Sequence, residues 1–106
     1  MAHGAYDKYV FGNAHLGGAP TKNLAVVMSI FDPGVSSGKH KHNVEEGFII
    51  LRGYGKATIG DTECELEPDL LLYAPAEVPH EFVNTGHESL VLLAMFSKSS
   101  YSCDRL

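Results

Sequence analysis

Short apolar runs separated by turn signals follow one another through the chain, and this rhythm limits the possible folds more than any other feature. The runs LAVVMSIF (24–31) and LVLLAMF (90–96) are typical, because they are rich in residues that favour strands. Turn signals such as Asp32-Pro33-Gly34 recur about every ten residues. No run keeps the three- and four-residue apolar spacing of an amphipathic helix. The sequence therefore predicts an all-β sandwich or closed barrel.

Eight strands are predicted from these runs. They cover residues 6–11, 24–31, 47–51, 56–59, 63–66, 70–74, 80–83 and 90–96. Within 56–66 polar and apolar residues alternate around the turn at Gly60, which predicts a hairpin with Cys64 and Leu66 on its inner face.

The length and composition fit one small domain. A chain of 106 residues with 44% hydrophobic and 20% charged residues can bury a single core. We therefore treat residues 1–106 as one domain, in which residues 1–23 form an N-terminal strand and loop arm. Residues 98–106 make a Ser-rich polar tail, which we expect to fray or to dock on a partner subunit.

The charge and the cysteines exclude several classes of protein. A formal net charge of −5 gives no electrostatic reason to expect nucleic acid or an anionic membrane as partner. Cys64 and Cys103 lie far apart in the sequence and are expected to be reduced thiols. Neither a signal peptide nor an apolar segment approaching the ~20 residues of a membrane helix is present, so we expect a cytoplasmic protein.

The stretch from Gly34 to Gly53 carries the densest group of potential metal ligands. His40 and His42 point to the same face if they lie on one strand, because side chains alternate along a strand. Lys39 and Lys41 would then face water. Glu46 heads the apolar run that follows. A polar strand edge would show the same His-x-His pair, so this pair alone does not decide between an edge and a metal site.

These residues resemble a known family. Gly34, His40, His42, Glu46 and Gly53 match every fixed position of the first cupin motif. Pro75, His80 and Asn84 match part of the second motif, which departs from the family pattern at Asp69 and Glu77, where glycine is usual. The chain thus resembles a small single-domain metal-binding cupin, and the resemblance implies a small double-stranded β-helix, a jelly-roll-like cupin barrel.

The resemblance also implies a metal site. Its ligands would be His40, His42, His80 and Glu46, holding one divalent transition metal. The chemistry of the donors agrees independently, since imidazoles with one carboxylate suit Fe, Mn, Ni, Zn, Cu or Co, and the lack of a thiolate argues against a structural zinc centre. Fe, Mn or Ni is favoured, because four protein ligands leave open positions only on a metal that prefers five or six ligands.

Several further residues are candidates for the substrate pocket. Phe48, Ile50 and Phe82 are in phase with ligands on their own strands, and they form either core or pocket wall. Met28, Ile30, Tyr73 and Met95 are candidates whose phase the sequence leaves open. Tyr73, as a phenol inside an apolar barrel, and Glu77, near the barrel mouth, are the candidate catalytic acid or base. Glu45 is expected to face solvent.

The family resemblance does not fix the reaction. We expect a metal-dependent enzyme acting on a small oxygen-rich substrate, a sugar-derived or hydroxy or keto acid, by lyase or isomerase-type or dioxygenase chemistry. The alternatives are a non-catalytic module that binds or senses a carbohydrate or organic acid, and a metal site that serves stability only. Many small cupins pair through their sheets, so the resemblance implies a homodimer.

Overall fold

A computed structural model describes residues 4–12, 17–99 and 101–106 of the chain. In these residues the chain forms ten strands and no helix. The strands are β1 (Ala5–Phe11), β2 (Ala25–Phe31), β3 (His40–His42), β4 (Glu46–Arg52), β5 (Gly55–Ile59), β6 (Thr62–Leu66), β7 (Leu71–Ala74), β8 (His80–Asn84), β9 (Leu90–Phe96) and β10 (Cys103–Arg105). The predicted all-β class is confirmed.

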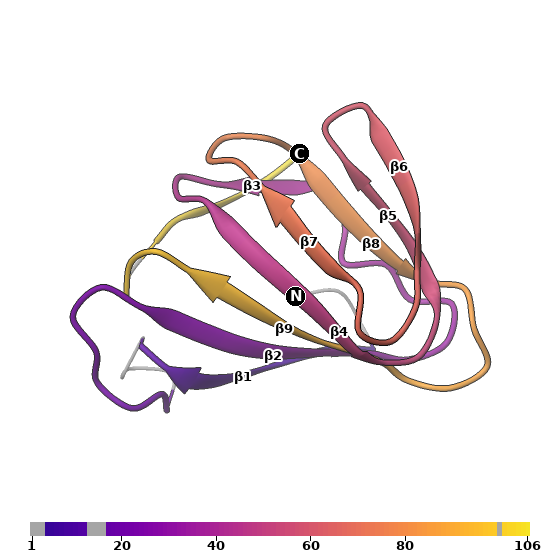
Figure 1. The fold of residues 1–106 in the computed structure, drawn as a ribbon, viewed down its shortest axis with the longest axis horizontal. Coiled ribbons are helices and arrows are strands. Elements are labelled where there is room, and N and C mark those ends of the chain that lie inside the picture. Colours follow the sequence, from indigo (N-terminus) through magenta and orange to yellow (C-terminus); the bar gives the residue numbers. More distant parts are fainter. Residues whose placement is uncertain (1–3, 13–16, 100) are drawn as a thin grey trace.

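Two five-stranded sheets pack against each other (Figure 1). Their strand orders are β1-β2-β9-β4-β7 and β10-β3-β8-β5-β6, and all pairings within them are antiparallel. The chain passes repeatedly from one sheet to the other. Consequently β3 and β4, which carry the first motif, lie in different sheets and face each other across the interior.

The core lies between the sheets and is built from alternate residues of each strand. Ile50, Leu90 and Leu92 are fully buried there, together with the predicted inward residue Leu66. Asn84 of the second motif is also fully buried, and its side-chain amide bonds the carbonyls of Phe31 and Glu88 and the amide of Gly86 at 2.8–2.9 Å. Asn84 thus ties the turn after β8 to β2, which is a structural role.

The motif glycine Gly53 is required by its surroundings. Its φ is 88°, a conformation that side chains with a Cβ rarely adopt, and a Cβ there would lie 2.5 Å from the carbonyl oxygen of Ser89. Asp69 and Glu77, the two departures from the family pattern, also have positive φ values of 72° and 65°. The backbone keeps its left-handed course at both positions although neither residue is glycine.

The structure establishes the phase of β2, which the sequence leaves open. Ala25, Val27, Ser29 and Phe31 point inward, so the pocket candidates Met28 and Ile30 lie on the outer, half-buried face. The sequence of β2 is apolar on both faces and therefore does not reveal its phase. The polar residue Ser29 is accommodated inside because its hydroxyl donates to Asp7 of β1 at 2.7 Å.

The C-terminal tail is ordered against its own chain. Its strand β10 pairs with β3, with Cys103 opposite His42 and Arg105 opposite His40, and the amide of Leu106 bonds Lys39 O at 3.0 Å. The expectation that the tail frays is therefore wrong. The reason is that β3 offers unpaired backbone groups on that side, which a further strand satisfies. Of the N-terminal arm, residues 1–3 and 13–16 lie outside the described residues.

Candidate metal centre

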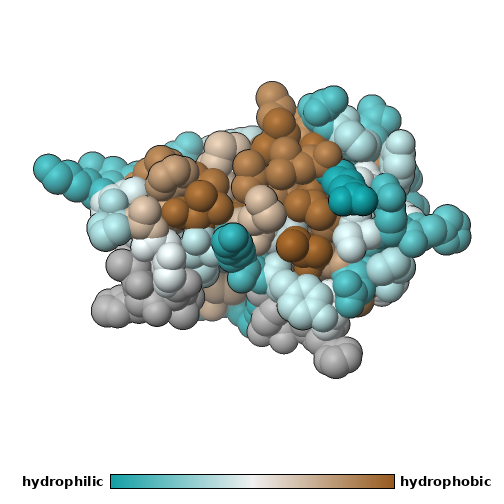
Figure 2. Space-filling model, turned by 90° about the horizontal axis from the view of Figure 1, so that it is seen from below, coloured by the Kyte–Doolittle hydropathy of each residue, from teal (hydrophilic) through white to brown (hydrophobic). Residues whose placement is uncertain are grey.

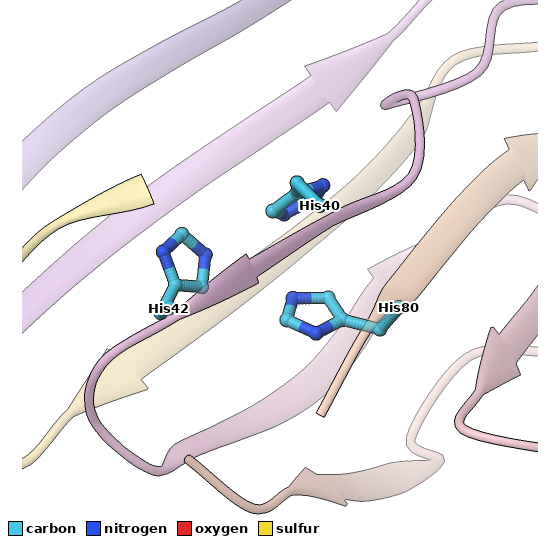
Figure 3. A group of neighbouring side chains, drawn as sticks. All are labelled: His40, His42 and His80. Carbon is cyan, nitrogen blue, oxygen red and sulfur yellow. The ribbon is translucent and has the colours of Figure 1, made fainter. Parts of the chain in front are cut away.

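Three histidines from two adjacent strands converge inside the barrel. His40 and His42 project from β3 and His80 from the start of β8, where His40 and His80 are register partners. One ring nitrogen from each lies within 4.8 Å of the others (Figure 3). The alternation that the sequence predicted for His40 and His42 places both on the interior face, so the polar-edge alternative is wrong.

The backbone fixes how each imidazole points. The Nδ1 atoms of His40, His42 and His80 lie 2.7, 3.0 and 3.1 Å from the carbonyl oxygens of residues 38, 102 and 78. Because a carbonyl oxygen only accepts, each Nδ1 must carry the proton and donate it. The Nε2 lone pairs are therefore free, and this is the tautomer in which histidine binds a metal through Nε2.

Glu46 approaches the same point from the opposite sheet. Its Oε1 lies 3.1 Å from His80 Nε2 and 3.5 Å from His42 Nε2, and the residue is only 4% exposed. Among the described residues, Glu46 Oε1 and His80 Nε2 are buried without a hydrogen-bond partner. Two buried acceptors that face each other at this distance repel unless a cation or proton lies between them. The residues present therefore fit a divalent metal.

Burial sets the protonation states that a metal requires. Desolvation lowers the pKa of His40 to about 4, and it lowers the pKa of His42 as well. Both imidazoles are consequently neutral near pH 7, as metal ligation demands. Desolvation raises the pKa of Glu46. An ionised carboxylate at this position is costly without a positive charge beside it, which a bound metal supplies.

A cavity of about 180 Å³ reaches these residues. His40, His42 and Glu46 contribute to its lining, and Phe48, Phe82 and Phe96 form an apolar wall. This volume is below the ~300 Å³ at which pockets for drug-sized ligands begin, so it suits a small molecule. Because the cavity extends to the ligand residues, a bound metal would be accessible to such a molecule.

The predicted pocket residues divide into two groups. Phe48 and Phe82 line the cavity, whereas Ile50 is fully buried in the core and Met28 lies on the outer face of β2. Met95 also faces outward and is 38% exposed. Phe48 and Phe82 belong both to the cavity wall and to the hydrophobic core, which is usual in a small barrel.

The two candidate acid–base residues lie away from the cavity. Tyr73 is 57% exposed, since it is the register partner of Gly47, which is out of phase with Glu46. Its expected position inside the barrel is therefore wrong. Glu77 forms an ion pair with Lys41 at 3.1 Å on the outside, and its amide bonds His42 O at 2.8 Å. It supports the backbone of β3 rather than entering the cavity.

Residues from both ends of the chain complete the cavity, and the sequence interpretation missed them. They are Asp7 and Tyr9 of β1 and Tyr101, Cys103 and Arg105 near the C-terminus. Tyr101 stacks on Phe96 with ring centroids 3.9 Å apart, and its hydroxyl lies 2.7 Å from that of Tyr9. Burial is the main cause that raises the pKa of Tyr101, and the hydrogen bond with the Tyr9 hydroxyl raises this pKa further. No hydrophobic pattern in the short tail marks Tyr101, Cys103 and Arg105 as cavity residues.

The amino-acid sequence of the chain is similar to a known protein family and to several curated proteins. The model of the family described as "Cupin domain" matches residues 27–96. Auxin-binding protein 1 of Arabidopsis thaliana is 28% identical over 86 residues, covering 73% of this chain and 43% of that protein. Auxin-binding protein 4 of Zea mays is 30% identical over 88 residues, covering 74% and 43%. The chain thus spans less than half the length of these curated relatives.

Solved structures with the same fold include enzymes. Bacillus subtilis oxalate decarboxylase, in a study of its Mn(II) centres, superposes with a TM-score of 0.86 at 20% identity, covering 100% of this chain and 29% of that chain. A structure of DMSP lyases superposes with a TM-score of 0.77 at 23% identity, covering 88% and 47%. At these identities the likeness establishes the fold alone, a small barrel of the predicted class.

Proposed function

Because the chain belongs to the cupin family, as its motifs predicted, we propose that it is a metal-dependent enzyme acting on a small oxygen-rich substrate. The substrate class is a sugar-derived or hydroxy or keto acid that chelates the metal, converted by lyase or isomerase-type or dioxygenase chemistry. The observation that carries this proposal is that three free Nε2 lone pairs and a buried carboxylate converge beside a cavity that reaches them. A site that served stability alone would need no such cavity.

The proposed ligands are His40, His42, His80 and Glu46. The bound ion would act as a Lewis acid toward a substrate oxygen. Fe, Mn or Ni is proposed over Zn, Cu or Co, because these ions keep open positions beside four protein ligands. The Mn(II) centres of the structurally similar oxalate decarboxylase support this choice. Phe48, Phe82 and Phe96 would exclude water from the substrate and so strengthen its polar contacts.

Metal analysis of protein purified without chelators tests this proposal. We expect about one transition-metal ion per chain, and its loss in His42→Ala. His87→Ala is the matched control, because His87 is an exposed histidine in the bend after β8 and does not line the cavity. Equal metal content in all three proteins would refute the ligand assignment. Conversion of small hydroxy and keto acids by the metal-loaded protein, followed by NMR, then tests for turnover.

A second candidate function is binding without catalysis. The curated relatives that match this chain are named auxin-binding proteins, which favours a non-catalytic module for a small organic acid or carbohydrate. The two functions share the metal centre and differ in turnover. A metal-loaded protein that binds small acids saturably and returns them unchanged after prolonged incubation would favour the binding module over the enzyme.

We also propose that the protein forms a homodimer. The outer face of the sheet β1-β2-β9-β4-β7 carries apolar residues on neighbouring strands, among them Met28, Ile49, Leu71, Tyr73 and Met95, and Leu71 is 68% exposed. Figure 2 shows apolar residues gathered on the lower side of the molecule, where β2, β9 and β4 lie in Figure 1. Pairing two copies through this uncharged row would cover it on both at once.

Light scattering tests the dimer. The wild type is expected to be dimeric at micromolar concentration and the variant with Leu71→Lys and Tyr73→Lys monomeric. Lys56→Glu on the polar outer face of β5 is the control. A monomeric wild type would refute the proposed dimer and would leave the proposed metal site unaffected.

A further inference from the structure

The short ribbon formed by β3 and β10 presents more than metal ligands to the cavity. Arg105 is the register partner of His40, and Cys103 is the register partner of His42. Directly opposite residues of an antiparallel pair share one face, so Arg105 and Cys103 project on the same side as the two histidines. Asp104 and Lys41 form the pair between them and lie on the other face. Of these charged residues, Arg105 therefore lies on the histidine face of the ribbon, whereas Asp104 and Lys41 lie on the opposite face.

Arg105 is placed to receive an anion. It is the only lysine or arginine among the described residues that line the cavity, and within the described ranges it forms no ion pair. Its Nη1 donates to the carbonyl oxygen of Ser37 at 2.6 Å, which anchors the side chain. A guanidinium has five N–H donors in a planar fork, so this bond leaves donors for a carboxylate.

The other charges around the cavity are compatible with this role. Asp7 is the one further carboxylate in the described lining besides Glu46, and its Oδ1 already accepts the Ser29 hydroxyl at 2.7 Å. A divalent ion with Glu46 as its carboxylate ligand would leave a net positive charge at the centre. With Arg105 in the same lining, the cavity would carry two positive centres.

We propose that Arg105 binds a second, anionic group of the substrate, so that the substrate is a small acid held by the metal at one end and by Arg105 through a carboxylate at the other. This proposal rests on the proposed function, since it needs the metal site. Arg105 lies outside residues 27–96, the part matched by the family model. The specificity for acids is therefore a property of this chain's own C-terminal strand.

A comparison of malonate with acetate isolates the second carboxylate. The protein is loaded with Co²⁺, and each acid is titrated while the visible absorbance of the bound cobalt is followed. Acetate can occupy the metal with its single carboxylate, whereas malonate has another carboxylate for Arg105. In Arg105→Gln the Kd of malonate should rise roughly 10- to 100-fold, the usual range for losing a charge-assisted pair, with acetate changed less than about twofold.

Arg52→Gln is the matched control, because Arg52 is an exposed arginine at the end of β4 that does not line the cavity. It should leave both affinities unchanged. If Arg105→Gln fails to fold, the same two titrations are made with Arg105→Lys. A smaller loss of malonate affinity is then expected, because the positive charge remains.

The outcomes separate this proposal from the proposed function. A wild type that takes up no cobalt refutes both. A wild type that takes up cobalt, with Arg105→Gln leaving malonate unchanged or weakening malonate and acetate equally, refutes the role of Arg105 alone. In the last case Arg105 would act on the fold or on the metal and not on the second carboxylate.

Discussion

Glu46→Gln should have opposite effects on the metal-free and the metal-loaded protein. In the metal-free protein, at a pH high enough to ionise the carboxyl group, Glu46 Oε1 and His80 Nε2 face each other at 3.1 Å without other partners among the described residues. Glutamine has nearly the same shape but can turn its amide N–H toward His80 Nε2. The substitution thus replaces a repulsive contact with a hydrogen bond and removes a buried charge.

The size of the effect follows from these two terms. A buried hydrogen bond contributes about 1 kcal/mol net, and a buried polar group without a partner costs about 1–3 kcal/mol. We therefore expect metal-free Glu46→Gln to be more stable than the wild type by about 1–3 kcal/mol. For a domain of this size each 1 kcal/mol corresponds to roughly 4–8 °C in Tm.

The metal-loaded protein should respond in the other direction. Loss of a carboxylate ligand should weaken metal binding by more than the roughly 10–100-fold that is lost when a residue behind a ligand is removed. Thermal unfolding by circular dichroism, with chelator and with excess Mn²⁺, measures both effects. Binding raises the Tm of the wild type by mass action, and this rise should be much smaller in the variant.

The critical result is that Glu46→Gln has opposite effects on the stability of the metal-free and the metal-loaded protein. If Glu46→Gln lowers the Tm of the metal-free protein and keeps the full Mn²⁺-induced rise, Glu46 is a structural residue and not a ligand. The gain in metal-free stability should also shrink as pH falls, because the raised pKa of Glu46 lets the wild-type carboxyl take up a proton and donate to His80.

Two further predictions concern stability. Burial lowers the pKa of His40 to about 4 from 6.5, so the unfolded metal-free chain binds more protons between these values. Its denaturant midpoint should therefore fall as pH drops from about 6.5 to 4, and this fall should be weaker in His40→Gln. Gly34→Ala should cost roughly 1–2 kcal/mol, for positive φ alone, because no atom of the described residues lies within 4 Å of its Cβ position. Gly53→Ala should cost more than about 3 kcal/mol, since its Cβ also meets the backbone of Ser89. Equal costs in urea unfolding would refute this.

The sequence predicted the strands and the interior ligand face well because both depend on local alternation. The two histidines of a His-x-His sequence must lie on the same face of a strand. The family pattern supplied His80 and Glu46 from elsewhere in the chain. The phases of Met28 and Tyr73 could not be predicted in this way. Their strands are apolar on both faces because the outer face of that sheet is itself apolar, so alternation is lost.

The residues at the chain ends escaped prediction for a different reason. Arg105 acquires its position only through pairing of β10 with β3, a contact between segments more than 60 residues apart in the sequence. A three-residue strand with every residue exposed has no hydrophobic pattern of its own. Its side chains are directed by the register of the partner strand, and local sequence carries no information about that register.

This pairing links the proposed carboxylate anchor to the proposed metal centre. The tail that brings Arg105 to the cavity also supplies the Ser102 carbonyl that accepts the His42 Nδ1 proton at 3.0 Å. Anything that lifts the tail would therefore remove the proposed carboxylate anchor and free the orientation of one proposed ligand together. The part of the chain that the family model matches, residues 27–96, contains all four proposed ligands and the phenylalanine wall, whereas the segments outside it contribute five further residues of the cavity lining: Asp7, Tyr9, Tyr101, Cys103 and Arg105. Barrels with the same metal site can accordingly take different substrates by changing only the strands that flank it.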